Sequence, residues 1–227
     1  MPRIARLVVP GYPHHVTQRG NYRQDVFRGD SDRRRYLELI SSYSKKHSLD
    51  ILCYCLMNNH VHFIVMPSKE DSLAAAFRTA HTLYSQYFNK KMKACGHLWQ
   101  GRFYSCVLDD RHLLAAARYI ERNPVRIKIV KKPTDYVWSS ARNHAGISQG
   151  DIIDTNNLFK YIEVVQNRWE GFVDKIDESD EISMIRKYTT TGRPLGTGYF
   201  IEKLEKIFGE KLHVSPVGRP KKTVSKK

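Results

Sequence analysis

The stretch LDILCYCLMNNHVHFIVMP, residues 49–67, decides how we expect this chain to fold. Two runs rich in β-branched and other apolar residues are separated by Asn58 and Asn59. Asparagine tolerates the backbone angles of a tight two-residue turn. The stretch therefore predicts an antiparallel hairpin with strands over 49–57 and 60–67.

Elements on the amino-terminal side of this hairpin are a strand and a helix. HHVTQRGN (14–21) alternates enough to predict a short strand that ends in a turn at Gly20 and Asn21. Apolar residues then recur at helical spacing to about His47, and Ser31 or Asp32 can cap that helix.

On the carboxy-terminal side we expect a helix over about 72–90, a strand in LWQGRFYSCVL (98–108) and a helix in DRHLLAAARYIERN (110–123) that Pro124 ends. Strand, helix, hairpin, helix, strand, helix is the order of a ferredoxin-like α+β fold, an antiparallel sheet with helices packed on one face. The other face would then be free for a ligand.

The character of the chain changes after about Ile147. In LFKYIEVVQNRWEGFVDKI (158–176) apolar residues step by three and four, which predicts one amphipathic helix, and DEISMIRKY and YFIEKLEKIF predict two shorter ones. The last stretch is basic and poor in apolar residues. We therefore divide the chain into an α+β domain over 1–146, a helical region over 147–212 and a disordered basic tail over 213–227.

Composition limits the kinds of partner. The chain has 38 Lys plus Arg against 23 Asp plus Glu, a net charge of +15 and a pI near 9.7, which favours a polyanion such as a nucleic acid. Neither a signal peptide nor an apolar run of about 20 residues is evident, so we expect a cytoplasmic protein without a membrane partner. The four cysteines lack CxxC spacing and are interpreted as structural thiols, with a zinc site as the alternative.

His60 and His62 are the first candidate functional residues. Side chains alternate across a strand, so both imidazoles point to one side with Val61 on the other, a spacing that suits two ligands of one metal ion. The alternative for either residue is a hydrogen-bonded core histidine.

The helix expected over 110–123 offers a third ligand and a nucleophile. Tyr119 and Asn123 are four residues apart and share one helical face. Two imidazoles and an amide oxygen would leave room for Mg²⁺ or Mn²⁺ to take a phosphate oxygen, and a tyrosine beside such an ion can attack phosphorus. With 13 tyrosines in the chain, Tyr84, Tyr87 and Tyr104 remain rivals at this stage.

Four segments in this order, PGYPHHVTQRGN, MNNHVHFIV, LWQGRFYS and YIERNPVR, resemble the REP-associated tyrosine transposases, which are single-tyrosine HUH transposases acting on single-stranded DNA. The resemblance runs from about residue 8 to about 145. It implies that His60 and His62 are the metal pair, Tyr119 the nucleophile and Asn123 the remaining ligand. It also implies cleavage through a 5′-phosphotyrosine and a free 3′-hydroxyl, with no high-energy cofactor.

Basic residues near these segments are candidate DNA contacts, although a solvated basic surface would also account for each of them. They are Arg19, Arg23, Arg102 and Arg126 and, in the second of two Gly-Arg-Pro copies, Arg219 with Lys221 and Lys222. Trp99 and Phe103 are candidates for stacking on bases, with sheet core as the favoured alternative. His14 and His15 are treated as candidate DNA contacts rather than as metal ligands.

The sequence thus predicts a metal-dependent enzyme that cleaves and rejoins single-stranded DNA beside hairpin repeats. A small-molecule substrate would not account for the net charge of +15. The additional carboxy-terminal segment favours a monomer over a homodimer. The alternatives are a replication-initiator or relaxase-like nickase and a DNA-binding regulator without catalytic activity.

Overall fold

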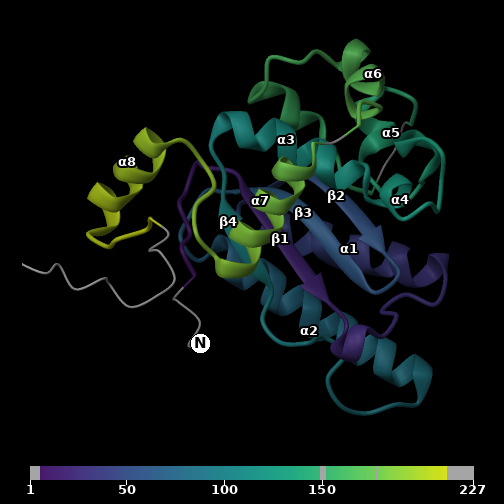
Figure 1. Cartoon of the computed structure of the whole chain (residues 1–227). Coiled ribbons are helices and arrows are strands. Elements are labelled where there is room, and N and C mark those ends of the chain that lie inside the picture. Colours follow the sequence, from purple (N-terminus) through teal and green to yellow (C-terminus); the bar gives the residue numbers. More distant parts are fainter. Residues whose placement is uncertain (1–5, 149–151, 177, 214–227) are drawn as a thin grey trace, which may run out of the picture.

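The computed structural model describes residues 6–148, 152–176 and 178–213. Its centre is a four-stranded antiparallel sheet of β1 (His14–Arg19), β2 (Leu49–Met57), β3 (His60–Pro67) and β4 (Tyr104–Val107), in the order β2-β3-β1-β4 (Figure 1). The α+β class and the antiparallel sheet predicted from the sequence are confirmed.

The hairpin forms as its sequence predicts. Met57 and His60 pair across the turn of Asn58 and Asn59, and the pairing continues, with a shift of register between Ile51 and Cys53, to Leu49 opposite Pro67. The backbone oxygens of both turn residues accept hydrogen bonds from the segment after β1, so the turn also fixes that loop. This loop contains the short 3-10 helix η1 (Asn21–Arg23).

One face of the sheet is covered by α1 (Asp30–Lys46) and α2 (Ser72–Met92) (Figure 1). Asp32, a predicted cap, lies in the first turn of α1, where it accepts the backbone N–H of Arg28 at 2.9 Å. The first core contains residues of the sheet and both helices, among them Val16, Tyr36, Ile40, Phe63, Val65, Phe77 and Tyr84.

The opposite face is not free, in contrast to the expectation. α3 (Asp110–Glu121) and α7 (Ser179–Thr191) lie across it (Figure 1). Ile64, Met66 and Cys106 point to this side and pack with residues of both helices in a second core. An apolar sheet face of this kind is stable only when another element covers it.

Two boundaries differ from the sequence prediction. The fourth strand begins at Tyr104 rather than Leu98, because Leu98, Trp99 and Phe103 pack into the first core as part of a loop. α3 ends at Glu121, and Pro124 lies in the first turn of a new helix, α4 (Asn123–Arg126). Proline is tolerated there because a first-turn N–H has no partner within the helix.

The single helix expected over 158–176 is wrong. The segment forms η3 (Asn156–Lys160), η4 (Gln166–Arg168) and α6 (Trp169–Val173). The apolar residues do not share a face, since Trp169 is fully buried whereas Ile176 is 85% exposed.

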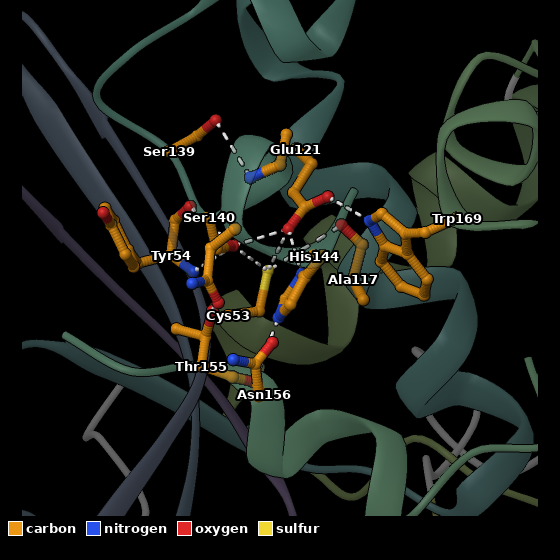
Figure 2. A network of polar contacts seen from close by, with 12 residues as sticks. Cys53, Tyr54, Ala117, Glu121, Ser139, Ser140, His144, Thr155, Asn156 and Trp169 are labelled. Carbon is orange, nitrogen blue, oxygen red and sulfur yellow. Dashed lines mark hydrogen bonds and ion pairs between the residues drawn. The ribbon is translucent and has the colours of Figure 1, made fainter. Parts of the chain in front are cut away.

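Trp169 is held by the buried carboxylate of Glu121, at the end of α3 (Figure 2). Its indole Nε1 donates to Glu121 Oε2 at 2.8 Å, while Ser140 and His144 donate to Oε1 at 2.5 and 2.6 Å. The other ring nitrogen of His144 lies 3.1 Å from the Thr155 carbonyl oxygen. This network joins α3 to α5 (Ala141–His144), α6 and the segment between them.

The two shorter carboxy-terminal helices are confirmed as α7 and α8 (Gly198–Phe208). α8 packs on Val9 and Val107 in a small third core. Cys53, Cys55 and Cys106 are buried free thiols, as expected for structural cysteines, and Cys95 is exposed. None of the helices within the described residues combines the length and apolar character that a membrane span requires.

Candidate active site

His60 and His62 lie on the sheet face covered by α3 and α7. They alternate along β3 with Val61 and Phe63, which enter the first core on the other side. The two imidazole rings are 5.0 Å apart between centroids and nearly perpendicular. At this separation both rings can reach one ion between them.

His60 is oriented by the hairpin turn. Its Nδ1 lies 2.6 Å from Oδ1 of Asn59, whose amide Nδ2 donates to the backbone oxygen of Arg23 at 3.2 Å. Because the amide oxygen only accepts, the His60 proton is on Nδ1. Nε2 of His60 therefore has a free lone pair, the state in which imidazole binds a metal.

His62 is held by His15 of β1, whose Nε2 is 3.0 Å from Nδ1 of His62. The prediction that His14 and His15 contact DNA is wrong, because both are buried. His14 binds the backbone of Val9 and Tyr12, and the other nitrogen of His15 lies 2.7 Å from Oγ1 of Thr189.

Burial keeps these histidines neutral. Burial, aided by the nearby charge of Arg19, lowers the pKa of His60 to about 4. Burial also lowers the pKa of His15 to about 3. It lowers the pKa of His62 well below its ordinary value, with smaller contributions from the neighbouring His60, His15, Arg19 and Arg126. Both metal-ligand candidates are thus unprotonated on one nitrogen at neutral pH.

Tyr119 approaches His62 from α3. The phenol ring is 5.7 Å from the His62 ring and perpendicular to it. The rival tyrosines are elsewhere: Tyr84 is buried in the first core and donates to the Val26 carbonyl, Tyr87 donates to Asp32, and Tyr104 begins β4.

Two guanidinium groups flank Tyr119, which is only 5% exposed. Arg126 lies over its ring at 4.5 Å, and Arg186 of α7 places Nε 3.4 Å from the hydroxyl oxygen. A phenol between two cations is positioned to act on an anionic group such as a phosphate.

Asn123 is buried beside Arg126, whose Nη1 donates to the Asn123 amide oxygen at 2.9 Å. The amide Nδ2 is buried without a partner. Within the described parts of the chain, no three His, Cys, Asp or Glu side chains gather to hold a metal ion. The donors here that could hold a divalent cation are the two Nε2 atoms and the Asn123 amide oxygen, which accepts from Arg126 in this structure.

The other predicted DNA contacts lie in different parts of the molecule. Arg19 is partly buried opposite His60 in the register, and Arg23 is exposed in the loop after β1. Arg102 is exposed beside a hollow of about 820 Å³ between α2 and the 96–103 loop. Arg219, Lys221 and Lys222 lie outside the described residues.

Trp99 and Phe103 belong to the first core, in agreement with the favoured alternative to base stacking. Sequence reasoning assigned no role to Arg186 and Thr189, because no local pattern shows that α7 returns to the sheet. For His15 a signal existed, since it shares a strand face with Thr17 and Arg19 beside the metal-candidate strand.

Comparisons with known proteins identify a family and a similar fold. The family described as "Transposase IS200 like" matches residues 9–123, about half of the chain. A solved structure of a REP-associated tyrosine transposase bound to a REP hairpin has a similar fold, with a TM-score of 0.53 at 19% identity over 73% of this chain and 99% of that one. A putative transposase from Deinococcus radiodurans matches with a TM-score of 0.38 at 17% identity, over 53% of this chain and 97% of that one. No curated protein matches the sequence.

Proposed function

The chain belongs to the IS200-like transposase family, and we propose that it cleaves and rejoins single-stranded DNA with Tyr119 as its nucleophile. The observation that carries this proposal is the placement of the Tyr119 ring 5.7 Å from His62, on the same sheet face as His60. The imidazoles of His60 and His62 and the phenol of Tyr119 meet within one chain, which favours a monomer with the whole site in one subunit.

His60 and His62 would hold Mg²⁺ or Mn²⁺ through Nε2, with the Asn123 amide oxygen as a third ligand. A bound divalent cation would withdraw charge from a phosphate oxygen and so make the phosphorus a better electrophile. Hard divalent ions of this kind accept oxygen and imidazole ligands and keep positions open for substrate.

Tyr119 would attack the phosphorus of one phosphodiester. The phenol gives up its proton as a bond forms between the phenolic oxygen and phosphorus. The bond from phosphorus to the 3′ oxygen breaks, and that oxygen takes up a proton, so no proton is gained or lost overall. The products are a 5′-phosphotyrosine and a free 3′-hydroxyl. Attack by a 3′-hydroxyl on the phosphotyrosine reverses the step without an energy source, because the phosphotyrosine retains the free energy of the cleaved phosphodiester bond.

Arg126 and Arg186 would neutralise the charge that develops during this attack. Both guanidinium groups lie against the Tyr119 ring or hydroxyl. Preorganised cations in a site with little water stabilise a transition state more than they would in solution. Arg19, near His60, would contact an adjacent phosphate.

We further propose a hairpin-bearing substrate, because the relative with the similar fold is bound to a REP hairpin. The basic residues outside the site, together with the net charge of +15, supply a surface for the DNA backbone.

The test is formation of a covalent adduct. Purified protein is incubated with Mg²⁺ or Mn²⁺ and labelled single strands that contain a hairpin, and the adduct is resolved on a denaturing gel. We expect Tyr119→Phe and His62→Ala to abolish the adduct. Tyr87→Phe is the matched control, since its hydroxyl binds Asp32 on the other side of the sheet, and it should retain activity. Adduct formation by Tyr119→Phe would show that another residue is the nucleophile.

Two further readouts, strand transfer and retention in a native gel, separate the alternatives. A transposase joins the cleaved strand to a second DNA end. A replication-initiator or relaxase-like nickase would share the site chemistry but act on a different substrate, without this transfer. A DNA-binding regulator would retain the labelled strand in a native gel and form no adduct with any hairpin.

A further inference from the structure

A chain of three polar contacts connects α7 to His62. Oγ1 of Thr189 lies 2.7 Å from the backbone oxygen of Ile185 and 2.7 Å from Nδ1 of His15. Nε2 of His15 lies 3.0 Å from Nδ1 of His62. Thr189, His15 and His62 are all buried, so water does not compete for these contacts.

The direction of each hydrogen bond follows from the Ile185 carbonyl, which is at one end of this series of contacts. The Ile185 oxygen only accepts, so the hydroxyl of Thr189 donates its single proton there. Oγ1 of Thr189 therefore accepts from Nδ1–H of His15. A neutral imidazole has one N–H, so Nε2 of His15 is an acceptor and Nδ1 of His62 donates to it.

A charged His15 would reverse the last contact, because it would donate from both nitrogens. Neither of its two partners is an anion, and complete burial opposes a positive charge on this ring. The neutral arrangement is the one that the surroundings support.

We infer that α7 positions the metal-binding histidine: Thr189, through His15, keeps the proton of His62 on Nδ1 and leaves Nε2 free for a divalent cation. The metal-binding part of this inference rests on the proposed function. Thr189 and His15 are thus positioning residues, and the carboxy-terminal region is part of the catalytic centre. Asn59 performs the corresponding task for His60.

The proton positions can be measured without metal or DNA. In ¹⁵N-labelled, metal-free protein at neutral pH, long-range proton–nitrogen correlation spectra distinguish the two imidazole tautomers, and His15→Ala and His62→Ala assign the signals. We expect the proton on Nδ1 in both rings. In Thr189→Val, Nδ1–H of His15 loses its acceptor, so the protons should move to Nε2 of His15 and then to Nε2 of His62.

Two variants serve as controls for Thr189→Val. Thr189→Ser keeps the hydroxyl and should keep the wild-type tautomers. Thr190→Val makes the same change at the next residue, whose hydroxyl is exposed and donates to the Arg186 carbonyl. It should leave both rings as they are. Valine and threonine have nearly the same shape, so Thr189→Val should fold, as a backbone amide spectrum will show.

Metal affinity provides the second readout. In a Mn²⁺ titration followed by electron paramagnetic resonance, without DNA, Thr189→Val should bind about 10- to 100-fold more weakly than wild type. Thr189→Ser and Thr190→Val should bind as wild type does.

The two readouts separate the two hypotheses. A wild-type His62 with its proton on Nε2, or Thr189→Val with unchanged tautomers, overturns the positioning of the His62 proton by Thr189 and His15. This holds even if the enzyme binds metal and cuts DNA. Wild-type protein that binds Mn²⁺ no better than His62→Ala removes the metal centre from the proposed function, while the spectra still decide where the protons are.

Discussion

Tyr119 is the residue at which the chemistry and the packing conflict. As the proposed nucleophile, its hydroxyl would have to reach a phosphate, but the side chain is buried under α7 and its oxygen contacts Nε of Arg186. Arg186 is itself exposed, so it can move to the surface or remain as a ligand of an incoming phosphate. The same side chain would then cover the nucleophile before DNA binds and contact the phosphate afterwards.

Arg186→Ala should slow covalent adduct formation by about two orders of magnitude, because it removes a cation beside the reacting oxygen. DNA affinity should change little, since one phosphate contact among many is lost. Lys187→Ala is the control: this neighbouring side chain is exposed and lies 6.0 Å from the Tyr188 ring rather than at Tyr119. Single-turnover rates with saturating DNA measure both variants, and equal rates would exclude a role for Arg186.

At the scale of elements, the segment 158–176 shows why spacing alone misled. Its apolar residues recur at helical intervals, but Trp169 is drawn to the Glu121 carboxylate while Val165 is 53% exposed. Hydrogen bonding of a buried carboxylate outweighs the modest helix preference of a surface segment. The buried Glu121 in the Tyr-Ile-Glu-Arg-Asn motif is consequently an attachment point for α6.

Trp169→Phe should lower the free energy of unfolding by about 1–3 kcal/mol, because it leaves one oxygen of a buried carboxylate without its donor. Trp138→Phe is the matched control, since its indole donates at 3.1 Å to the exposed carboxylate of Asp30, and it should cost much less. Urea unfolding of the two variants tests this. Equal losses would mean that the network does not depend on Trp169.

At the scale of the whole molecule, the positive charge predicts a steep salt dependence of DNA binding. Proteins that contact 6 to 10 phosphates lose roughly 10³- to 10⁵-fold in affinity between about 50 and 200 mM salt, because bound counterions are released. Fluorescence anisotropy with a labelled hairpin strand measures the slope. A shallow slope would show that the basic surface is not where DNA binds.

The buried histidines predict a loss of stability in mild acid. Burial lowers the pKa of His14 to about 4 and the pKa values of His15 and His81 to about 3. Between those values and about 6.5, the unfolded chain binds protons that the folded chain excludes. Stability is therefore complete above about pH 6.5 and falls as the pH decreases.

Urea unfolding at several pH values from 7 to 4.5 measures this loss, at up to about 1.4 kcal/mol per pH unit for each histidine. His81→Gln, which removes one of these groups, should give a shallower dependence than wild type. A constant free energy of unfolding over this range would contradict the buried, neutral state of these rings.

The domain division at residue 146 stays a prediction, although α7 and α6 share the second core with the sheet and α3. Mutations in the carboxy-terminal region are therefore expected to affect the catalytic centre, as the contacts of Thr189 and Arg186 indicate.

Local sequence determined the hairpin, the alternation that places His60 beside His62, and the helical face of Tyr119, because each depends on neighbours within a few residues. Only the tertiary structure decided what lies on the second sheet face, why His15 points at His62 rather than at DNA, and which cations surround the phenol. The Tyr119–Arg186 and His15–Thr189 contacts join residues 67 and 174 positions apart, and chain spacing contains no signal for pairs that meet only when an apolar surface has to be covered.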